Sequence, residues 1–134
     1  MSRLLKVLLT ACAFMVPAST MAADANEKSI KARKAYMQVL GHNMGNLGAM
    51  AKGKVPYDAA KASMFAGDLN LAAQMRNGAM WPKGSDAGAY PGKTRAKSEV
   101  WSTYPKVAEK GKALKTAAAA LAMTAGDGLE ALQA

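Results

Sequence analysis

Cysteine and histidine are almost absent from this 134-residue sequence, since each occurs only once, as Cys12 and His42. A lone cysteine cannot form an intramolecular disulfide. One cysteine and one histidine are also too few for a zinc site or a catalytic triad built on several such residues. The nine acidic residues are scattered, and the sequence has no nucleophile–base pair and no phosphate-binding loop. We therefore do not expect an enzyme.

Two kinds of apolar pattern are also missing. No stretch alternates apolar and polar residues with a period of two, so no β-strands are expected. The longest mainly apolar run, residues 7–16, is about half of the ~20 residues that a membrane-spanning helix requires. A single all-α domain without a membrane span is therefore predicted, because the length suits one domain.

The first 23 residues have the layout of a secretory signal peptide. Arg3 and Lys6 precede the apolar run, and Met21-Ala22-Ala23 supplies small residues for cleavage after Ala22 or Ala23. The alternative is a lipoprotein signal around Cys12, but Lys6 leaves too short an apolar run before it. Export to the periplasm is predicted, with a domain over residues 24–134 that contains no cysteine.

The predicted domain is basic and rich in lysine. The formal net charge of +9 falls to +7 when Arg3 and Lys6 are left out. Such a charge attracts acidic partners or anionic surfaces, but evenly spread lysines are also typical of a solvated surface. No basic cluster is interleaved with aromatic residues, so nucleic acid is not an expected partner.

Apolar spacing predicts a first helix over about Glu27–Met50. A buried seam is expected at residues spaced by seven, with others between them: Ile30, Met37, Met44 and Ala51, then Arg33, Leu40 and Leu47. His42 lies outside this seam and is expected at the surface. Three glycines in this helix, Gly41, Gly45 and Gly48, suggest close approach of another helix or a bulky ligand.

Three further helices are expected. Asp58 is a natural N-cap for a helix that reaches about Arg76, and its buried stripe is Ala62, Phe65, Leu69 and Ala72. Residues 80–97 form a long loop, a length that is often functional. The third helix starts near Ser98 and kinks at Pro105. Asp127 is a candidate N-cap for a fourth helix, which the sequence follows for only two turns.

Several segments resemble the cytochrome c′ family, in the order that the family has them. They are Arg33-Lys34-Ala35-Tyr36-Met37, Leu40-Gly41-His42-Asn43-Met44-Gly45, Lys54-Val55-Pro56-Tyr57-Asp58-Ala59, Trp81-Pro82-Lys83-Gly84-Ser85-Asp86, Thr94-Arg95-Ala96-Lys97-Ser98-Glu99-Val100-Trp101 and Leu121-Ala122 through Asp127-Gly128-Leu129. The resemblance implies an antiparallel up-down-up-down four-helix bundle, with the fourth helix truncated in this chain.

The family carries haem c, which serves electron transfer or the binding of small gases such as NO or CO. By resemblance, Arg33 and Lys34 fall where the family approaches the haem propionates and edge, and a guanidinium suits a carboxylate. Met37 falls over the distal face of the iron, and Ser85 and Asp86 touch the haem from the loop. Redox partner proteins and a homodimer are also implied.

One family feature is missing, because no Cys-x-x-Cys-His motif occurs in these 134 residues. We expect that the sequence breaks off before that motif. A haemless relative is the other explanation, and then a binding or interaction role remains. Two forms of it are a Cu(I) carrier that uses methionine thioethers, and a module that completes its bundle by self-association.

Overall fold

The computed structural model describes residues 18–134, and every regular element in that range is helical. The predicted signal peptide falls mostly on residues 1–17, outside the described part. The elements are α1 Ala18–Ala51, α2 Ala59–Gln74, a 3₁₀ turn at Gly78–Met80, α3 Glu99–Ser102, α4 Tyr104–Thr124 and α5 Leu129–Gln133. The all-α prediction is confirmed. No helix within residues 18–134 has the length and apolarity to cross a membrane.

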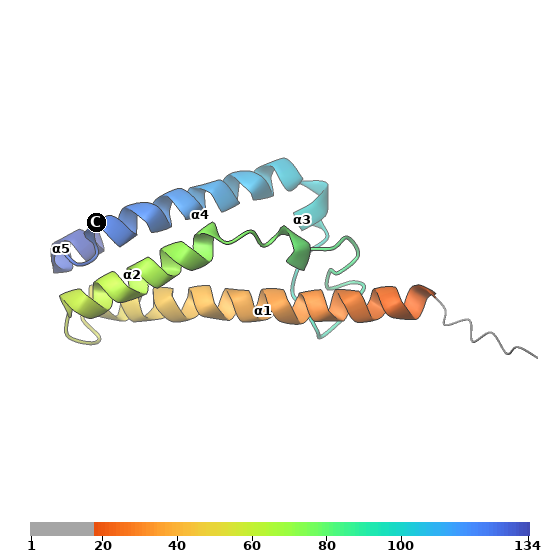
Figure 1. Cartoon of the computed structure of the whole chain (residues 1–134), viewed down its shortest axis with the longest axis horizontal. Coiled ribbons are helices and arrows are strands. Elements are labelled where there is room, and N and C mark those ends of the chain that lie inside the picture. The colour runs from red at the N-terminus through yellow and green to blue at the C-terminus, as the bar shows by residue number, and fades with distance from the viewer. Residues whose placement is uncertain (1–17) are drawn as a thin grey trace, which may run out of the picture.

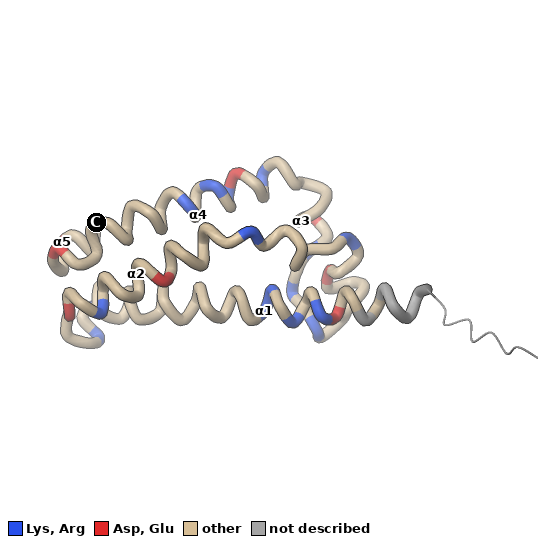
Figure 2. Tube along the Cα trace, viewed as in Figure 1, with Lys and Arg blue, Asp and Glu red and all other residues tan. Residues whose placement is uncertain are grey.

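Consecutive long helices run antiparallel, and α2 lies between α1 and α4 (Figure 1). The long loop and α3 lie near the first half of α1, whereas the α1–α2 turn and α5 lie at the other end. Figure 2 shows basic residues over the first half of α1 and the neighbouring loop. The two ends of the bundle therefore differ in both structure and charge.

Helix α1 is longer than predicted, because it begins at Ala18 and not near Glu27. The added turns contain several alanines, the residue with the highest helix propensity. Helix α2 ends at Gln74, before the predicted Arg76. Its N-cap is as predicted, since Asp58 Oδ1 accepts a hydrogen bond from Lys61 N at 2.9 Å.

This N-cap makes stability depend on pH. The hydrogen bond from Lys61 N lowers the pKa of Asp58 below its usual value. Its contribution is therefore complete above the unfolded pKa of about 4 and is lost as the pH falls through the lower, folded pKa. We expect Asp58→Asn to retain a capping oxygen but to lose this acid-side dependence. The measurement is the urea midpoint of each protein at several pH values from acidic to neutral. If the midpoint changed equally with pH in wild type and Asp58→Asn, the prediction would be contradicted.

The third predicted helix is two helices. Helix α3 ends at Ser102, Thr103 has a non-helical backbone, and α4 then starts at Tyr104 with Pro105 in its first turn. Proline is favoured there because the first turn has no partner for its N–H group. The prediction of a kink at Pro105 was wrong, since this proline begins a helix.

Helix α5 also starts differently from the prediction, because its N-cap is Gly128 and not Asp127. Gly128 has φ +140°, which a residue with a side chain rarely adopts. The Tyr57 hydroxyl takes the place of a side-chain cap. It accepts from Gly128 N at 3.0 Å and donates to Ala125 O at 2.9 Å. Tyr57 thus joins the α1–α2 turn to the α4–α5 turn.

The core lies on both sides of α2, where small residues allow close packing. Ala62, Ala66, Leu69 and Ala73 of α2 are buried, as is Ala118 of α4. On α1 the buried residues are Ile30, Arg33, Tyr36, Leu40, Asn43, Leu47 and Met50. The predicted burial of Met37 and Met44 was wrong, because they are 49% and 52% exposed. The buried face is rotated toward α2 and the loop, and no described element covers these methionines.

The glycines of α1 do not mark a close contact among the described residues. A Cβ added at Gly41, Gly45 or Gly48 would meet nothing within 4 Å. The expected approach of another helix is therefore not found among residues 18–134, and the approach of a bulky ligand stays a prediction. These glycines follow Met37 and Met44 along the same uncovered side of α1.

Candidate functional site

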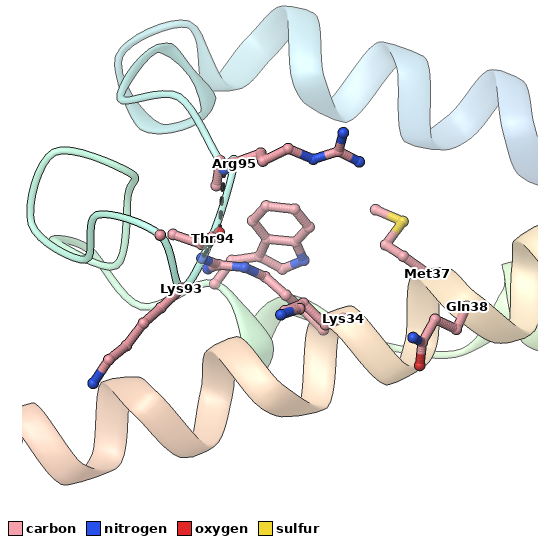
Figure 3. A pocket seen from close by; sticks show the side chains of 10 residues that line it. Lys34, Met37, Gln38, Lys93, Thr94 and Arg95 are labelled. Carbon is pink, nitrogen blue, oxygen red and sulfur yellow. Dashed lines mark hydrogen bonds between the residues drawn. The ribbon is translucent and has the colours of Figure 1, made fainter.

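A pocket lies at the end of the bundle where the first half of α1 meets the long loop (Figure 3). Its volume is about 650 Å³, within the range of small-molecule and cofactor sites. Figure 3 shows Met37 from α1 and Arg95 from the loop pointing toward one another across it. The lining residues are Arg33, Lys34, Met37, Gln38, Trp81, Gly92, Lys93, Thr94, Arg95 and Ala96.

Arg33 fastens the loop to α1 and so builds one wall of the pocket. Arg33 is only 3% exposed, and its Nη1 donates to Ser85 Oγ at 2.7 Å. Nη2 donates to Thr94 Oγ1 at 2.8 Å and to the carbonyl of Ser85. Nη1 also contacts Met80 O at 3.5 Å. Both terminal nitrogens are therefore used within the protein.

The two tryptophans of the chain lie at the same place. Trp81 lines the pocket, and its ring lies 4.9 Å from the Arg33 guanidinium carbon, within cation–π range. Trp101 of α3 packs against Trp81 with ring centroids 6.4 Å apart. It also donates from Nε1 to Trp81 O at 2.9 Å. The aromatic pair thus ties α3 to the pocket wall.

All four charged residues of the lining are basic. Burial lowers the pKa of Arg33, and the charge of Asp86 acts in the opposite direction. Lys93 forms an ion pair with Glu27, and that hydrogen bond and charge lower the pKa of Glu27. Among the described residues, neither Lys34 nor Arg95 has an acidic partner within 4.0 Å. Two exposed cations therefore remain at the mouth of the pocket.

The residues predicted for the site fall into two groups. Arg33, Lys34 and Met37 line the pocket. Ser85 lies behind it, completely buried, where its hydroxyl accepts from Arg33 and donates to Pro82 O at 2.7 Å. Asp86 is not in the lining. Its Oδ1 accepts from the backbone N–H groups of Gly88 and Ala89, which shapes the loop.

Sequence reasoning did not select several lining residues, above all Trp81, Lys93 and Arg95. The long loop was recognised as unusual by its length, and that was the available signal. The sequence pattern did not show that the loop folds back onto α1. The loop reaches α1 through Arg33 and the Lys93–Glu27 ion pair, which no local periodicity reveals.

Metal-binding side chains are not gathered here. His42 is exposed, as predicted, and its ring packs against Phe65 with centroids 5.9 Å apart. Within the described residues, no group of three or more His, Cys, Asp and Glu side chains could hold a metal ion. Met37 is the single methionine in the lining, so the pocket does not collect the several thioethers of a Cu(I) site.

Apolar residues of α4 extend beyond α2 at the same end. Gln74, the last residue of α2, donates to Lys115 O at 3.2 Å, which places the end of α2 beside the middle of α4. The first half of α4 therefore has no cover from α2. Tyr104, Val107 and Leu114 are 66%, 37% and 38% exposed. Both α1 and α4 thus leave apolar side chains open at the pocket end.

The sequence and the fold were compared with known proteins. The family described as Cytochrome C′ matches residues 28–134. A cytochrome c′ of Cereibacter sphaeroides is 39% identical over 129 residues, covering 96% of this chain and 85% of that protein. A cytochrome c-554 of the same organism is 33% identical over 125 residues, covering 93% and 81%.

A solved structure, described as a cytochrome c′ from Rhodobacter Spheriodes, has the same arrangement of helices. It superposes with a TM-score of 0.78 at 36% identity, covering 81% of this chain and 82% of that one. The antiparallel bundle predicted from the sequence is thereby confirmed. Family, relatives and fold agree, and this chain belongs to the cytochrome c′ family.

Proposed function

We propose that this chain is a periplasmic c-type haem protein for electron transfer or the binding of small gases, with its haem in the pocket between α1 and the long loop. The observation that carries the proposal is the pocket lining, which combines apolar side chains with four basic residues. When bound, haem supplies an iron that exchanges electrons and takes a small gas ligand. Export is supported by the signal-like residues 1–23.

The lining fits the acidic edge of a haem. Lys34 and Arg95 are exposed and have no acidic partner among the described residues, so both can pair with propionates. Arg33 acts behind them, because its terminal nitrogens already bind the loop. Ser85 and Asp86 support the site from the loop, Ser85 by holding Arg33 and Asp86 by its charge.

The lining also fits the faces of a haem but not the iron itself. Met37 and Trp81 offer apolar surface, and the Met37 thioether would pack against a bound haem on its distal side, as the family resemblance implies. No histidine lines the pocket, and residues 1–134 contain no Cys-x-x-Cys-His motif. Residues 1–134 by themselves would therefore hold haem without thioether bonds. Nothing in the lining suggests that the protein acts as an enzyme.

A charge-reversal experiment tests the propionate contacts. We expect Lys34→Glu/Arg95→Glu to weaken haemin binding about tenfold or more, since two cations facing two carboxylates become repulsive. The measurement is the Soret absorbance during a haemin titration. Lys52→Glu/Lys54→Glu changes the net charge equally, but at the α1–α2 turn, and should bind normally. Equal weakening by both variants would reject the assigned contacts.

Covalent attachment is tested on protein purified from its natural source. A Soret band that survives acid acetone shows thioether-bound haem, and hence cysteines outside the 134 residues. A band that is extracted shows haem held without covalent bonds. Colourless protein that also fails to bind haemin would refute the proposed function.

A homodimer through the outer side of α2 is proposed as well. Met64 and Leu71 share one side of α2, opposite its buried residues, and Met75 directly follows the helix; Leu71 is 72% exposed. We expect Leu71→Asp to raise the dimer dissociation constant about tenfold or more in analytical ultracentrifugation. Leu114→Asp introduces the same charge on α4 and should leave it unchanged. A wild-type protein that stays monomeric at high concentration would exclude this dimer.

A further inference from the structure

Most described methionines are exposed, whereas the leucines divide between buried positions and exposed ones, which are Leu71, Leu114 and Leu129. Leu40, Leu47, Leu69 and Leu132 are buried, whereas Met50 is the one buried methionine among the described residues. The methionines include Met37 and Met44, whose predicted burial in the seam of α1 was wrong. Most of their thioethers are open to solvent, at Met37, Met44, Met64, Met75 and Met123. Solvent-exposed thioethers are the ones that oxidants reach.

Met123 is the most exposed of them, at 82%. It lies in the last turn of α4, five residues after the buried Ala118, which places it about 140° around the helix from the core side. It does not line the pocket, and it lies on a different helix from the proposed dimer surface. Neither its packing nor the proposed function accounts for a thioether there.

We propose that Met123 is a site of reversible oxidation by peroxides, which consumes oxidant that would otherwise reach Met37 at the pocket. The sulfur attacks one peroxide oxygen, the O–O bond breaks, and an S=O bond forms. The proton of the attacked oxygen passes to the leaving oxygen, which departs as water. Sulfur loses two electrons, peroxide gains them, and methionine sulfoxide reductases restore the thioether.

The positions differ in what oxidation costs the protein. A sulfoxide at Met123 remains in water and disturbs no contact of the core. At Met50, which is 2% exposed, the polar S=O group would enter the apolar cluster. At Met37 it would change the lining of the pocket. Met123 can therefore cycle between the two states while the fold is preserved.

The test uses the purified chain with limiting hydrogen peroxide and reads each sulfoxide by peptide mass spectrometry. Met123 should be oxidised more than the other four exposed methionines, and the buried Met50 less than any of the five. Circular dichroism should be unchanged, and reductases for both sulfoxide stereoisomers should return the original mass. Oxidation of Met50 ahead of Met123, unfolding on oxidation at Met123, or no reduction would each overturn the proposal.

Protection of Met37 is tested by removing the thioether. We assume that reactivity follows the exposed fraction of each of the five exposed methionines. At the same limiting dose of peroxide, Met123→Leu then raises the share of Met37 molecules that become sulfoxide about 1.4-fold. Met50→Leu is the matched control and should leave that share unchanged, since leucine and methionine are close in volume. An unaltered Met37 share in Met123→Leu would refute the protective role. No haem is needed, so this result is independent of whether the proposed function holds.

Discussion

Replacing Arg33 with alanine is expected to lower the free energy of unfolding by about 3 kcal/mol. The substitution removes the group that binds Ser85 Oγ, the Ser85 carbonyl and Thr94 Oγ1, and it leaves these acceptors buried or half-buried without their donor. It also removes the cation over Trp81. The loop should detach from α1, so the pocket should lose one wall together with stability.

Urea denaturation followed by circular dichroism measures the stability change, and the combined emission of Trp81 and Trp101 reports the loop. Arg33→Lys keeps the charge but cannot reproduce the forked contacts, so it should fall between wild type and alanine. Arg95→Ala removes an exposed cation of the same pocket and should change stability by no more than about 0.5 kcal/mol. If Arg33→Ala and Arg95→Ala were equally stable, Arg33 would not fasten the loop.

Tyr57→Phe is expected to cost about 2 kcal/mol. Only the hydroxyl is lost, so the ring packing stays, but Ala125 O and Gly128 N lose their common partner. Since α5 has no other side-chain N-cap, the loss should be concentrated there. Hydrogen exchange should show faster exchange of α5 amides, such as that of Leu132, while α2 keeps its protection.

Tyr104→Phe removes the same hydroxyl from a residue that is 66% exposed. It should change neither stability nor exchange beyond about 0.5 kcal/mol. A uniform loss of protection across all helices in Tyr57→Phe would show a general structural defect. It would contradict the specific role of Tyr57 at the start of α5.

Much of the helical layout could be predicted from local chemistry. The cap at Asp58 was predictable because an aspartate before an amphipathic stretch is a local signal for a helix start. The long loop was predictable because its sequence lacks a helical period. The break at Thr103 was missed, because Pro105 permits either a kink or a helix start, and only the neighbouring fold selects between them. The Gly128 cap was missed since its partner, Tyr57, is far away in sequence.

Burial was harder to predict than helix position. The α1 pattern gave an apolar seam through Met37 and Met44, but which side is covered depends on where α2 and the loop pack. Arg33 was named a cofactor contact from the family resemblance, and its burial agrees with the predicted seam. Its hydrogen bonds to Ser85 and Thr94 follow from a loop fold that no period encodes. The haem contacts themselves remain predictions, whereas membership of the cytochrome c′ family is established.

Tryptophan emission during a haemin titration tests the central claim most directly. The chain has two tryptophans, Trp81 in the pocket lining and Trp101 packed against it, so haem bound there must quench both. We predict that the tryptophan emission falls to a low residual level and that this quenching saturates at one haem per chain. Emission that stays unchanged while the Soret band shows bound haem would place the haem elsewhere and contradict the account.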